Sequence, residues 1–453
     1  MAKLKQIRLD SPSMILKSKS LYEKAKELMP GGTQLLSKRP EMFAPGHWPA
    51  YYQNAKGCEI IDQDGNELLD MSMMGVGTCL LGYGDPDVSS AVINRIESGS
   101  MCSLNNPEEV QLAEKLLSIH PWAEQVRYAR TGGEAMSIAV RIARASAGRE
   151  IIAFCGYHGW HDWYLSANLS SSSPAGHLSG HLLPGLDPLG VPHGLSGTVI
   201  PFRYNQADEL KSILKKYSGK VAAVVMEPTR HVEPMPDFLK QVRELCDLAD
   251  AALIVDEITA GWRLHYGGVH LKYGLEPDMA VFGKALGNGH PIAAIVGKRK
   301  VMEAAQSTFI SSTYWTEGVG PVAALATLNK LESIDVPSHL KTISRKFRDG
   351  LQEVSISHGL NIRFSGHPAI TVIEFEHPQA AALQTLFTIQ MLQHGILTGS
   401  GFYVSWAHRE EHINRFLEAA DKILPQLGDA IESGNIMKRI PEGEKHSGFS
   451  RLT

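Results

Sequence analysis

The chain has 453 residues, of which 43% are hydrophobic, so it can bury a large core, and its length favours more than one domain. Its 44 Lys and Arg residues nearly balance 48 Asp and Glu residues, so neither a nucleic-acid partner nor a membrane surface is expected. The five cysteines form no C-x-x-C, which argues against a disulfide framework and a zinc site. Without a signal-peptide pattern or an apolar run long enough to span a bilayer, we expect a cytoplasmic protein that binds no metal.

The predicted elements divide the chain into four segments. Across residues 86–325, continuous apolar runs alternate with amphipathic helical patterns, which indicates an α/β domain with a mostly parallel sheet covered on both faces. Residues 1–85 and 326–436 mix short strands with helices, and we expect them to build a smaller α+β domain from both chain ends. Residues 437–453 are polar and are expected to be a loosely held tail.

The first functional motif is "RYARTGGEAMSIAVRIARA", where a strand meets Thr131, Gly132 and Gly133 and then a long amphipathic helix. Free backbone N–H groups and the positive end of the helix dipole favour a phosphate there, and glycines permit its close approach. An ordinary N-terminal cap by Thr131 is an equally good reading of this motif.

The second motif is "CGYHGWHDWY", which follows the apolar run "IIAF". Tyr157 can stack on a flat ring, and His158 or Trp160 can line the same site. Two alternatives are metal binding by His158 and His161 and plain aromatic packing. The next stretch, 166–198, is rich in Ser, Gly, Pro and His, and such a long loop is either a functional lid or a surface decoration.

An acid and an amine then follow two consecutive apolar runs. "LIVDEITAGWR" delivers Asp256 to the carboxyl end of a strand, and Lys284 stands 28 residues downstream after the run "MAVFG". Asp256 alone would be read as a helix cap or an ion-pair partner. Together, the two residues suit pyridoxal 5'-phosphate (PLP), whose aldehyde forms an imine with a lysine and whose pyridine nitrogen is kept protonated by an acid. An NAD enzyme is not indicated, because no G-x-G-x-x-G follows a strand with an acid about 20 residues on.

From Leu21 to Ile423, the chain resembles the class III, fold-type I PLP-dependent aminotransferases, and within them the glutamate-1-semialdehyde aminomutase branch. The resemblance rests on "LYEKAKELMPGG", "RTGGEAMSIAVRIARASAGR", "YHGWHDW", "VVMEPTRH", "IVDEITAGWR" and "FGKALGNGHPIAAIVG". It implies a large domain with a seven-stranded type of sheet and a small α+β domain. The aspartate and lysine motifs, at their observed separation, are its specific signals.

The resemblance also implies roles for individual residues. Lys284 would carry the cofactor imine and shuttle the proton, and Asp256 would hold the pyridine nitrogen. The other cofactor residues would be Tyr157 and His158 at the ring, Gly132 and Gly133 with Thr131 at the phosphate, and Glu227 of the Glu-Pro segment. Thr313 would reach the phosphate of a neighbouring subunit, so the active site would be shared across a homodimer.

Departures from the family pattern bear on the substrate. The usual Ser-Gly-Thr phosphate turn is Thr-Gly-Gly here, and "SSTYWTEGVGP" adds Trp315 and Glu317 near the expected substrate entrance. The distinctive loop 166–198 favours a simple aminotransferase over an aminomutase. Lys38 or Arg39 could hold a carboxylate, with a solvated surface as the alternative for both.

The expected reaction is ping-pong transfer of an amino group from an amino acid to an oxo acceptor. The stretches "LLSKRPEMFAPG" and "FISSTYWTE" resemble class III enzymes of carbohydrate synthesis, which points to an oxo sugar or sugar acid. The alternatives are glutamate-1-semialdehyde 2,1-aminomutase activity, another fold-type I PLP reaction such as decarboxylation or acyl condensation, and a non-catalytic protein that keeps the fold.

Overall fold

The structure is a computed structural model that describes residues 16–169, 186–229 and 232–448. Its elements fall into two compact units. The large unit contains residues 77–79 and 85–337, and the small unit contains the remaining described residues from both ends of the chain.

A seven-stranded sheet forms the centre of the large unit, with the strand order β4-β10-β9-β8-β7-β5-β6. All neighbouring pairs are parallel except the two that β10 makes with β9 and β4. The strands are β4 (Gln125–Ala129), β5 (Ile151–Cys155), β6 (Val199–Pro201), β7 (Val221–Met226), β8 (Ala252–Asp256), β9 (Met279–Phe282) and β10 (Ala293–Gly297).

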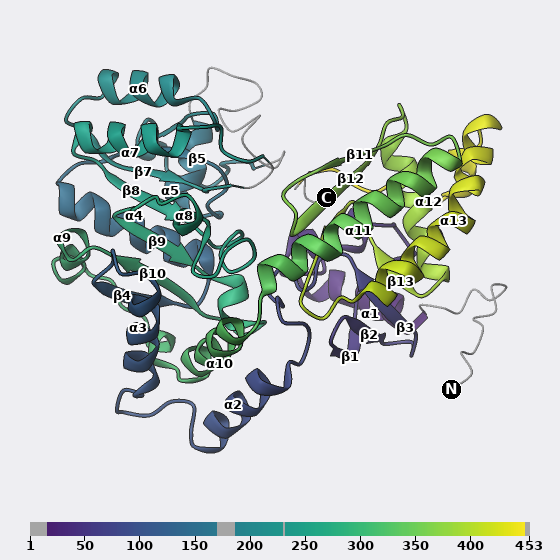
Figure 1. The fold of residues 1–453 in the computed structure, drawn as a ribbon, viewed down its shortest axis with the longest axis horizontal. Coiled ribbons are helices and arrows are strands. Elements are labelled where there is room, and N and C mark those ends of the chain that lie inside the picture. The colour runs from purple at the N-terminus through teal and green to yellow at the C-terminus, as the bar shows by residue number, and fades with distance from the viewer. Residues whose placement is uncertain (1–15, 170–185, 230–231, 449–453) are drawn as a thin grey trace. The chain divides into compact units, whose positions relative to one another are not determined.

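Helices cover both faces of this sheet (Figure 1). The helices of the large unit are α2 (Pro86–Glu97), α3 (Glu108–Ile119), α4 (Gly132–Ala147), α5 (Asp162–Leu165), α6 (Ala207–Lys216), α7 (Phe238–Ala249), α8 (Val269–Lys272), α9 (Arg299–Met302) and α10 (Val319–Ser333). The expectation of a mostly parallel α/β fold is therefore confirmed. The antiparallel direction of β10 could not be predicted, because an apolar run does not encode the direction of its strand.

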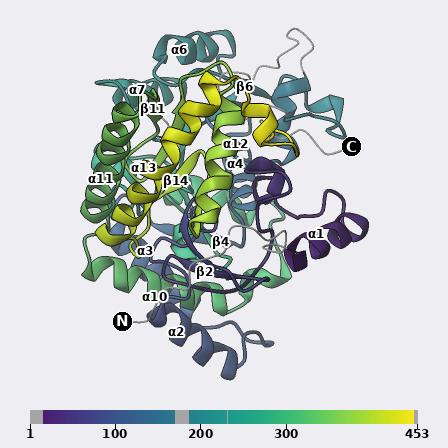
Figure 2. The ribbon, with the colours of Figure 1, turned by 90° about the vertical axis from the view of Figure 1, so that its right-hand side faces the viewer.

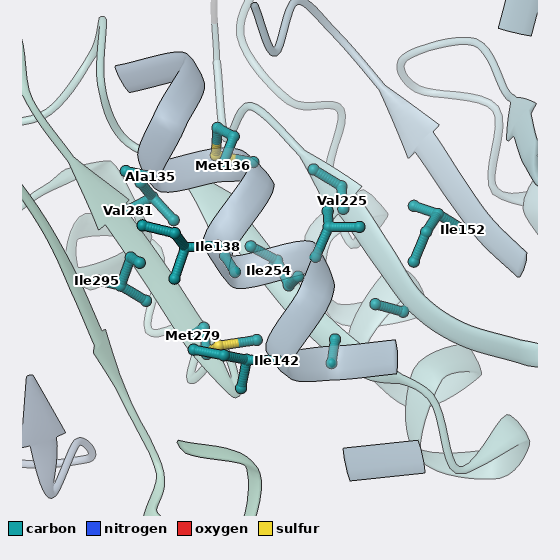
Figure 3. Packing of buried hydrophobic residues seen from close by; sticks show 14 of the residues in the cluster. Ala135, Met136, Ile138, Ile142, Ile152, Val225, Ile254, Met279, Val281 and Ile295 are labelled. Atoms are coloured by element: carbon teal, nitrogen blue, oxygen red, sulfur yellow. The ribbon is translucent and has the colours of Figure 1, made fainter. Parts of the chain in front are cut away.

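The α4 helix packs its apolar side on one face of the sheet (Figure 3). Ile138 and Ile142 of α4 meet Val225, Ile254 and Val281 of the strands, all of them buried. Their neighbours along the strands point to the opposite face, where they pack against α6 and α7. Because side chains alternate along a strand, a strand that is buried on both faces must be apolar throughout, as β7 is.

The small unit joins segments from both ends of the chain. One sheet has the order β1-β2-β3-β13, in which β13 from the C-terminal part runs parallel to β3 from the N-terminal part. A second, antiparallel sheet has the order β11-β12-β14. The strands are β1 (Tyr52–Lys56), β2 (Glu59–Asp62), β3 (Glu67–Met71), β11 (Ile362–Ser365), β12 (Ile370–Phe375), β13 (Ile396–Thr398) and β14 (Gly401–Tyr403).

Figure 2 shows three long helices of the small unit side by side: α11 (Val336–Ser357), α13 (Glu410–Glu432) and α12 (Ala380–Gln393). Their contact is aromatic, because the ring centroid of Phe416 lies 4.9 Å from that of Phe347 and 6.2 Å from that of Phe387. The first helix of the described residues, α1, spans Leu16–Leu28.

Part of the predicted loop 166–198 lies outside the described residues, namely 170–185. The described ends of this stretch form two short 3-10 turns, η3 (Ser166–Leu169) and η4 (His193–Leu195). Within the described part of the chain, no helix has both the length and the apolar character needed to cross a membrane.

Candidate active site

Asp256 and Lys284 lie at the same edge of the large sheet. Asp256 is the last residue of β8, and Lys284 follows β9 after one glycine. The two strands are parallel neighbours, with Asp256 in register with Val281. Parallel strands that adjoin each other present their carboxyl ends on one side, so the sheet topology brings the acid and the amine to one place.

Lys284 opens a short 3-10 turn, η5 (Lys284–Gly287), with φ of 44°. The left-handed region is rarely adopted by a residue with a side chain, and such strain is concentrated at functional sites. The Lys284 Nζ donates a hydrogen bond of 2.8 Å to the Thr259 Oγ1. Thr259 was missed from the sequence, although its position three residues after Asp256 in the same motif was the available signal.

Asp256 is buried and shares a proton with a buried histidine. Its Oδ2 lies 2.8 Å from the Nδ1 of His158, and its Oδ1 accepts the Ile258 N–H at 3.0 Å. Since the Nε2 of His158 lies 3.2 Å from the carbonyl oxygen of Cys155, which only accepts, Nε2 carries a proton and a further proton lies between Nδ1 and Oδ2. Burial raises the pKa of Asp256, and the hydrogen bond from His158 opposes that shift.

The contacts of His158 argue against one alternative from the sequence, a metal site made by His158 and His161. Both ring nitrogens of His158 are engaged by Asp256 and by the Cys155 carbonyl. Among the residues that the structure describes, no group of three or more His, Cys, Asp or Glu side chains is arranged to hold a metal ion.

Tyr157 is held in place by Glu227. Its backbone N–H donates to the Glu227 Oε2 at 2.9 Å, and Glu227 is almost fully buried at the end of β7. The preceding Gly156 has φ of 110°, and a Cβ there would lie 2.6 Å from the same Oε2 atom. The glycine is therefore required both for the backbone conformation and for the approach of the carboxylate.

The N-terminus of α4 carries the predicted phosphate turn. The Thr131 side chain accepts the Glu134 N–H, and Glu134 Oε2 accepts the N–H of Thr131, so the two form a capping box. The alternative reading of Thr131 as a helix cap is thus realised. The N–H groups of Gly132 and Gly133 have no acceptor among the described residues. They remain available to an anion.

Two side chains lie against these glycines: Ile258, which the sequence did not single out, and His161, which was considered only as a metal ligand. A Cβ on Gly132 would lie 2.8 Å from the Cδ1 of Ile258, and a Cβ on Gly133 would lie 3.0 Å from the ring of His161. Ile258 also lies 3.5 Å from where a Cβ on Gly283, next to Lys284, would be. Ile258 is therefore an apolar side chain between the phosphate turn and the lysine.

The segment that contains Trp315 and Glu317 is tied to the α4 N-terminus. The Trp315 Nε1 donates to the Glu134 Oε1 at 2.9 Å, and the Arg130 guanidinium donates to the carbonyl oxygens of Trp315 and Glu317 at 3.0 and 2.7 Å. The Glu317 carboxylate accepts the N–H groups at the start of α10. These hydrogen bonds hold the Trp315–Glu317 segment against the N-termini of α4 and α10 within the large unit. Thr313, the first residue of η7 (Thr313–Thr316), is exposed.

The other two candidate substrate residues belong to the small unit. Lys38 ends the 3-10 turn η1 (Leu36–Lys38), and Arg39 follows it with only 1% of its surface exposed. The solvated-surface alternative therefore does not describe Arg39.

The chemistry of this donor set fits PLP. The Lys284 amine, bonded to the Thr259 hydroxyl, suits the PLP aldehyde, and the buried Asp256, bonded to His158, suits the pyridine N–H. The N–H groups at the start of α4, which have no acceptor in the described chain, suit the phosphate. All of these groups belong to the large unit.

Comparisons with known proteins agree with this chemistry. Residues 42–424 match the family model for class-III aminotransferases. The chain is 33% identical to a 3-aminobutyryl-CoA aminotransferase of Cloacimonas acidaminovorans, over 91% of this chain and 98% of that protein. It is 31% identical to a glutamate-1-semialdehyde 2,1-aminomutase of Desulfovibrio desulfuricans, over 90% of this chain and 99% of that protein.

A solved structure, the FumI protein of Sphingopyxis sp. MTA144 in its PLP internal aldimine form, has the same fold. It superimposes with a TM-score of 0.81 at 26% identity, and the match covers 92% of this chain and 97% of that one. The expected resemblance, enzyme class and cofactor are confirmed. The chain belongs to the class III aminotransferase family and is a PLP-dependent transaminase of that family.

Proposed function

We propose that the enzyme exchanges an amino group between an amino donor and an oxo acceptor in two half-reactions, with Lys284 and Asp256 as its catalytic residues. The observation that carries the proposal is that the Lys284 amine and the Asp256 carboxylate lie at one edge of the sheet, each fixed by a hydrogen bond. The Lys284 amine is fixed by Thr259, and the Asp256 carboxylate is fixed by His158.

Bound PLP supplies an aldehyde that condenses with amines and a protonated pyridine ring that accepts electrons as a proton leaves the substrate carbon. Lys284 Nζ holds the cofactor at rest. When a substrate amine takes its place, the neutral Lys284 Nζ would remove the α proton of the substrate and return it in a second proton transfer. Its hydrogen bond to the Thr259 Oγ1 fixes the amine for both transfers.

Asp256 supplies the negative charge that keeps the pyridine nitrogen protonated. Burial alone would favour a neutral carboxyl group, as the raised pKa of Asp256 shows. The proton in the bond to His158 can reside on Nδ1, which leaves the charge on the carboxylate when a cation lies beside it. His158 is therefore the group that lets Asp256 be anionic in a buried position.

The remaining cofactor contacts are assigned to Tyr157 at the ring face and to the amides of Gly132 and Gly133 at the phosphate. Thr313 is exposed in its own chain, which supports its proposed role at the phosphate of a partner subunit in a homodimer. In this arrangement Trp315, hydrogen-bonded to Glu134, links the Thr313 segment to the α4 N-terminus.

We further propose an oxo sugar or sugar acid as the acceptor, supported by the sequence stretches around Lys38 and Phe309. The relatives widen the test to two other substrate classes, because one is named for 3-aminobutyryl-CoA and another for glutamate 1-semialdehyde. Intramolecular amino transfer of the aminomutase type is the second candidate. It differs in needing no separate donor and acceptor.

The test uses the purified holoenzyme and its Lys284→Ala variant. Visible absorption is recorded while amino donors are added singly, and borohydride-trapped cofactor is located by peptide mass spectrometry. We expect donor-dependent loss of the resting absorbance, an adduct on Lys284 and no covalent adduct in the variant. Acceptors from the three classes are then offered to the aminated enzyme, and sedimentation checks the dimer. An adduct on another lysine would overturn the assignment, and turnover of glutamate 1-semialdehyde alone would favour the aminomutase reaction.

A further inference from the structure

The ring of His161 occupies the space that a side chain at position 133 would need. A Cβ built on Gly133 lies 3.0 Å from both the Cε1 and the Nδ1 atoms of that ring, a contact tighter than real side chains normally make. Gly133 lies in the first turn of α4 and does not have a positive φ. The imidazole, and not the backbone conformation, therefore explains why glycine stands at this position.

The His161 ring is held where it lies. The indole of Trp160 stacks on it with a centroid distance of 4.5 Å and an interplanar angle of 21°. The His161 carbonyl accepts N–H groups from Tyr164 and Leu165 at 2.9 and 3.1 Å, which fixes the backbone at the start of α5. Gly159, with φ of 103°, lets the loop approach so closely that a Cβ there would lie 3.0 Å from the Gly133 Cα.

Despite this fixed position, the Nδ1 of His161 is buried and has no hydrogen-bond partner among the described residues. A buried polar atom without a partner costs stability, so its persistence in a fixed ring needs an explanation. The Nδ1 edge of the ring lies against Gly133, whose N–H group and that of Gly132 also lack acceptors in the described chain. Three hydrogen-bonding groups that have no partner in the described chain thus lie near the positive end of a 16-residue helix.

Burial lowers the pKa of His161, while Glu134 and Asp162 raise it in part. A neutral imidazole can still donate a hydrogen bond to an anion, because its Nδ1–H tautomer carries a proton on that atom. An oxyanion with several acceptor oxygens would satisfy all three groups at once.

We propose that His161 positions the cofactor phosphate by donating a hydrogen bond from Nδ1, beside the amides of Gly132 and Gly133. The inference rests on the proposed placement of the phosphate at this turn. It explains the change from Ser-Gly-Thr to Thr-Gly-Gly in the motif, since the imidazole replaces the hydroxyl group of a third residue that no longer has room.

The test compares two ligands on the apoenzyme: PLP and pyridoxal, which lacks the phosphate. Dissociation constants are measured by absorbance for the wild type and for His161→Ala, His161→Asn and His339→Ala. His339 is the matched control, because it is also half-buried with a pKa lowered by burial but belongs to the small unit. We expect His161→Ala to bind PLP about tenfold more weakly and pyridoxal unchanged, as for the loss of one hydrogen bond to a charged group.

His161→Asn keeps an N–H donor close to the Nδ1 position and should recover most of the PLP affinity. Thermal unfolding of each apoenzyme shows whether the variants fold. A His161→Ala protein that binds PLP as the wild type does, or that loses PLP and pyridoxal affinity equally, would overturn the proposal. The proposed catalytic role of Lys284 is judged separately, from the borohydride adduct of the wild type.

Reciprocal variants give a second readout. Gly133→Thr alone should weaken PLP binding, because its Cβ would displace the His161 ring. Combined with His161→Ala, the same threonine has room, and its hydroxyl should restore PLP affinity above that of either single variant. Additive losses in the double variant would show that the ring and the residue at position 133 do not serve the same ligand.

Discussion

Replacing Asp256 by Asn removes its charge and little else. The His158 Nε2 donates to the Cys155 carbonyl, so in a neutral ring Nδ1 becomes an acceptor that an Asn amide N–H can reach. The Asn carbonyl oxygen can still accept the Ile258 N–H, which the Asp256 Oδ1 accepts at 3.0 Å. Asp256→Ala, in contrast, removes the hydrogen bonds together with the charge and leaves a buried imidazole without its partner.

The expected magnitudes follow from these bonds. Loss of the charge that stabilises the protonated pyridine should cost about 2–4 kcal/mol in the proton-transfer step, or roughly 30-fold to 10³-fold in kcat. The free energy of unfolding of the Asp256→Asn apoenzyme should stay within about 1 kcal/mol of the wild type. Asp256→Ala should lose about 3 kcal/mol of stability, because His158 stays buried without its partner.

The rate is measured as a single half-reaction by rapid mixing of holoenzyme with amino donor, and stability by urea unfolding of the apoenzyme. Both variants must first be shown to hold PLP on Lys284. If the Asn variant reacts within threefold of the wild-type rate, Asp256 does not supply the electrostatic term assigned to it. If the Asn and Ala variants are equally unstable, the argument that an Asn side chain can keep the hydrogen bond to His158 is wrong.

Two further predictions concern stability. Gly156→Ala should lower the free energy of unfolding by about 2–4 kcal/mol and weaken PLP binding, because its φ is 110° and its Cβ would meet the Glu227 Oε2 at 2.6 Å. Gly148→Ala is the control in urea unfolding, because φ there is 59° but a Cβ would meet no atom within 4 Å. Its free energy of unfolding should fall by only about 1 kcal/mol. Equal losses in the two variants would refute the steric argument. Burial lowers the pKa of His408 to about 4, so the folded state binds fewer protons than the unfolded state between that pH and 6.5. The contribution of His408 to stability should therefore be full above pH 6.5 and fall by up to about 3 kcal/mol on acidification to pH 4. His408→Gln should flatten the pH dependence by that amount in urea titrations at several pH values. An unchanged slope would mean that His408 is not the titrating group.

The sequence by itself predicted the fold class and the chemistry. Runs such as "VAAVVM" can be stable only where both faces of a strand are covered, so the pattern of apolar runs indicates a buried, mostly parallel sheet. Asp256 and Lys284 could be paired in advance, because consecutive strands of such a sheet end at one edge. Both arguments depend on local pattern, which a single sequence contains.

Only the tertiary structure decided which groups hold those two residues. Thr259 follows β8 and lies 25 residues from Lys284 in the chain, and His158 follows β5 and lies 98 residues from Asp256. The tertiary structure also decided the antiparallel direction of β10, because an apolar run carries no sign of direction. It likewise decided the burial of Arg39, which the sequence pattern left open. His161 shows the reason most clearly. Its close approach to Gly133 depends on the path of a loop over a helix end, and no periodicity within either segment records that distance.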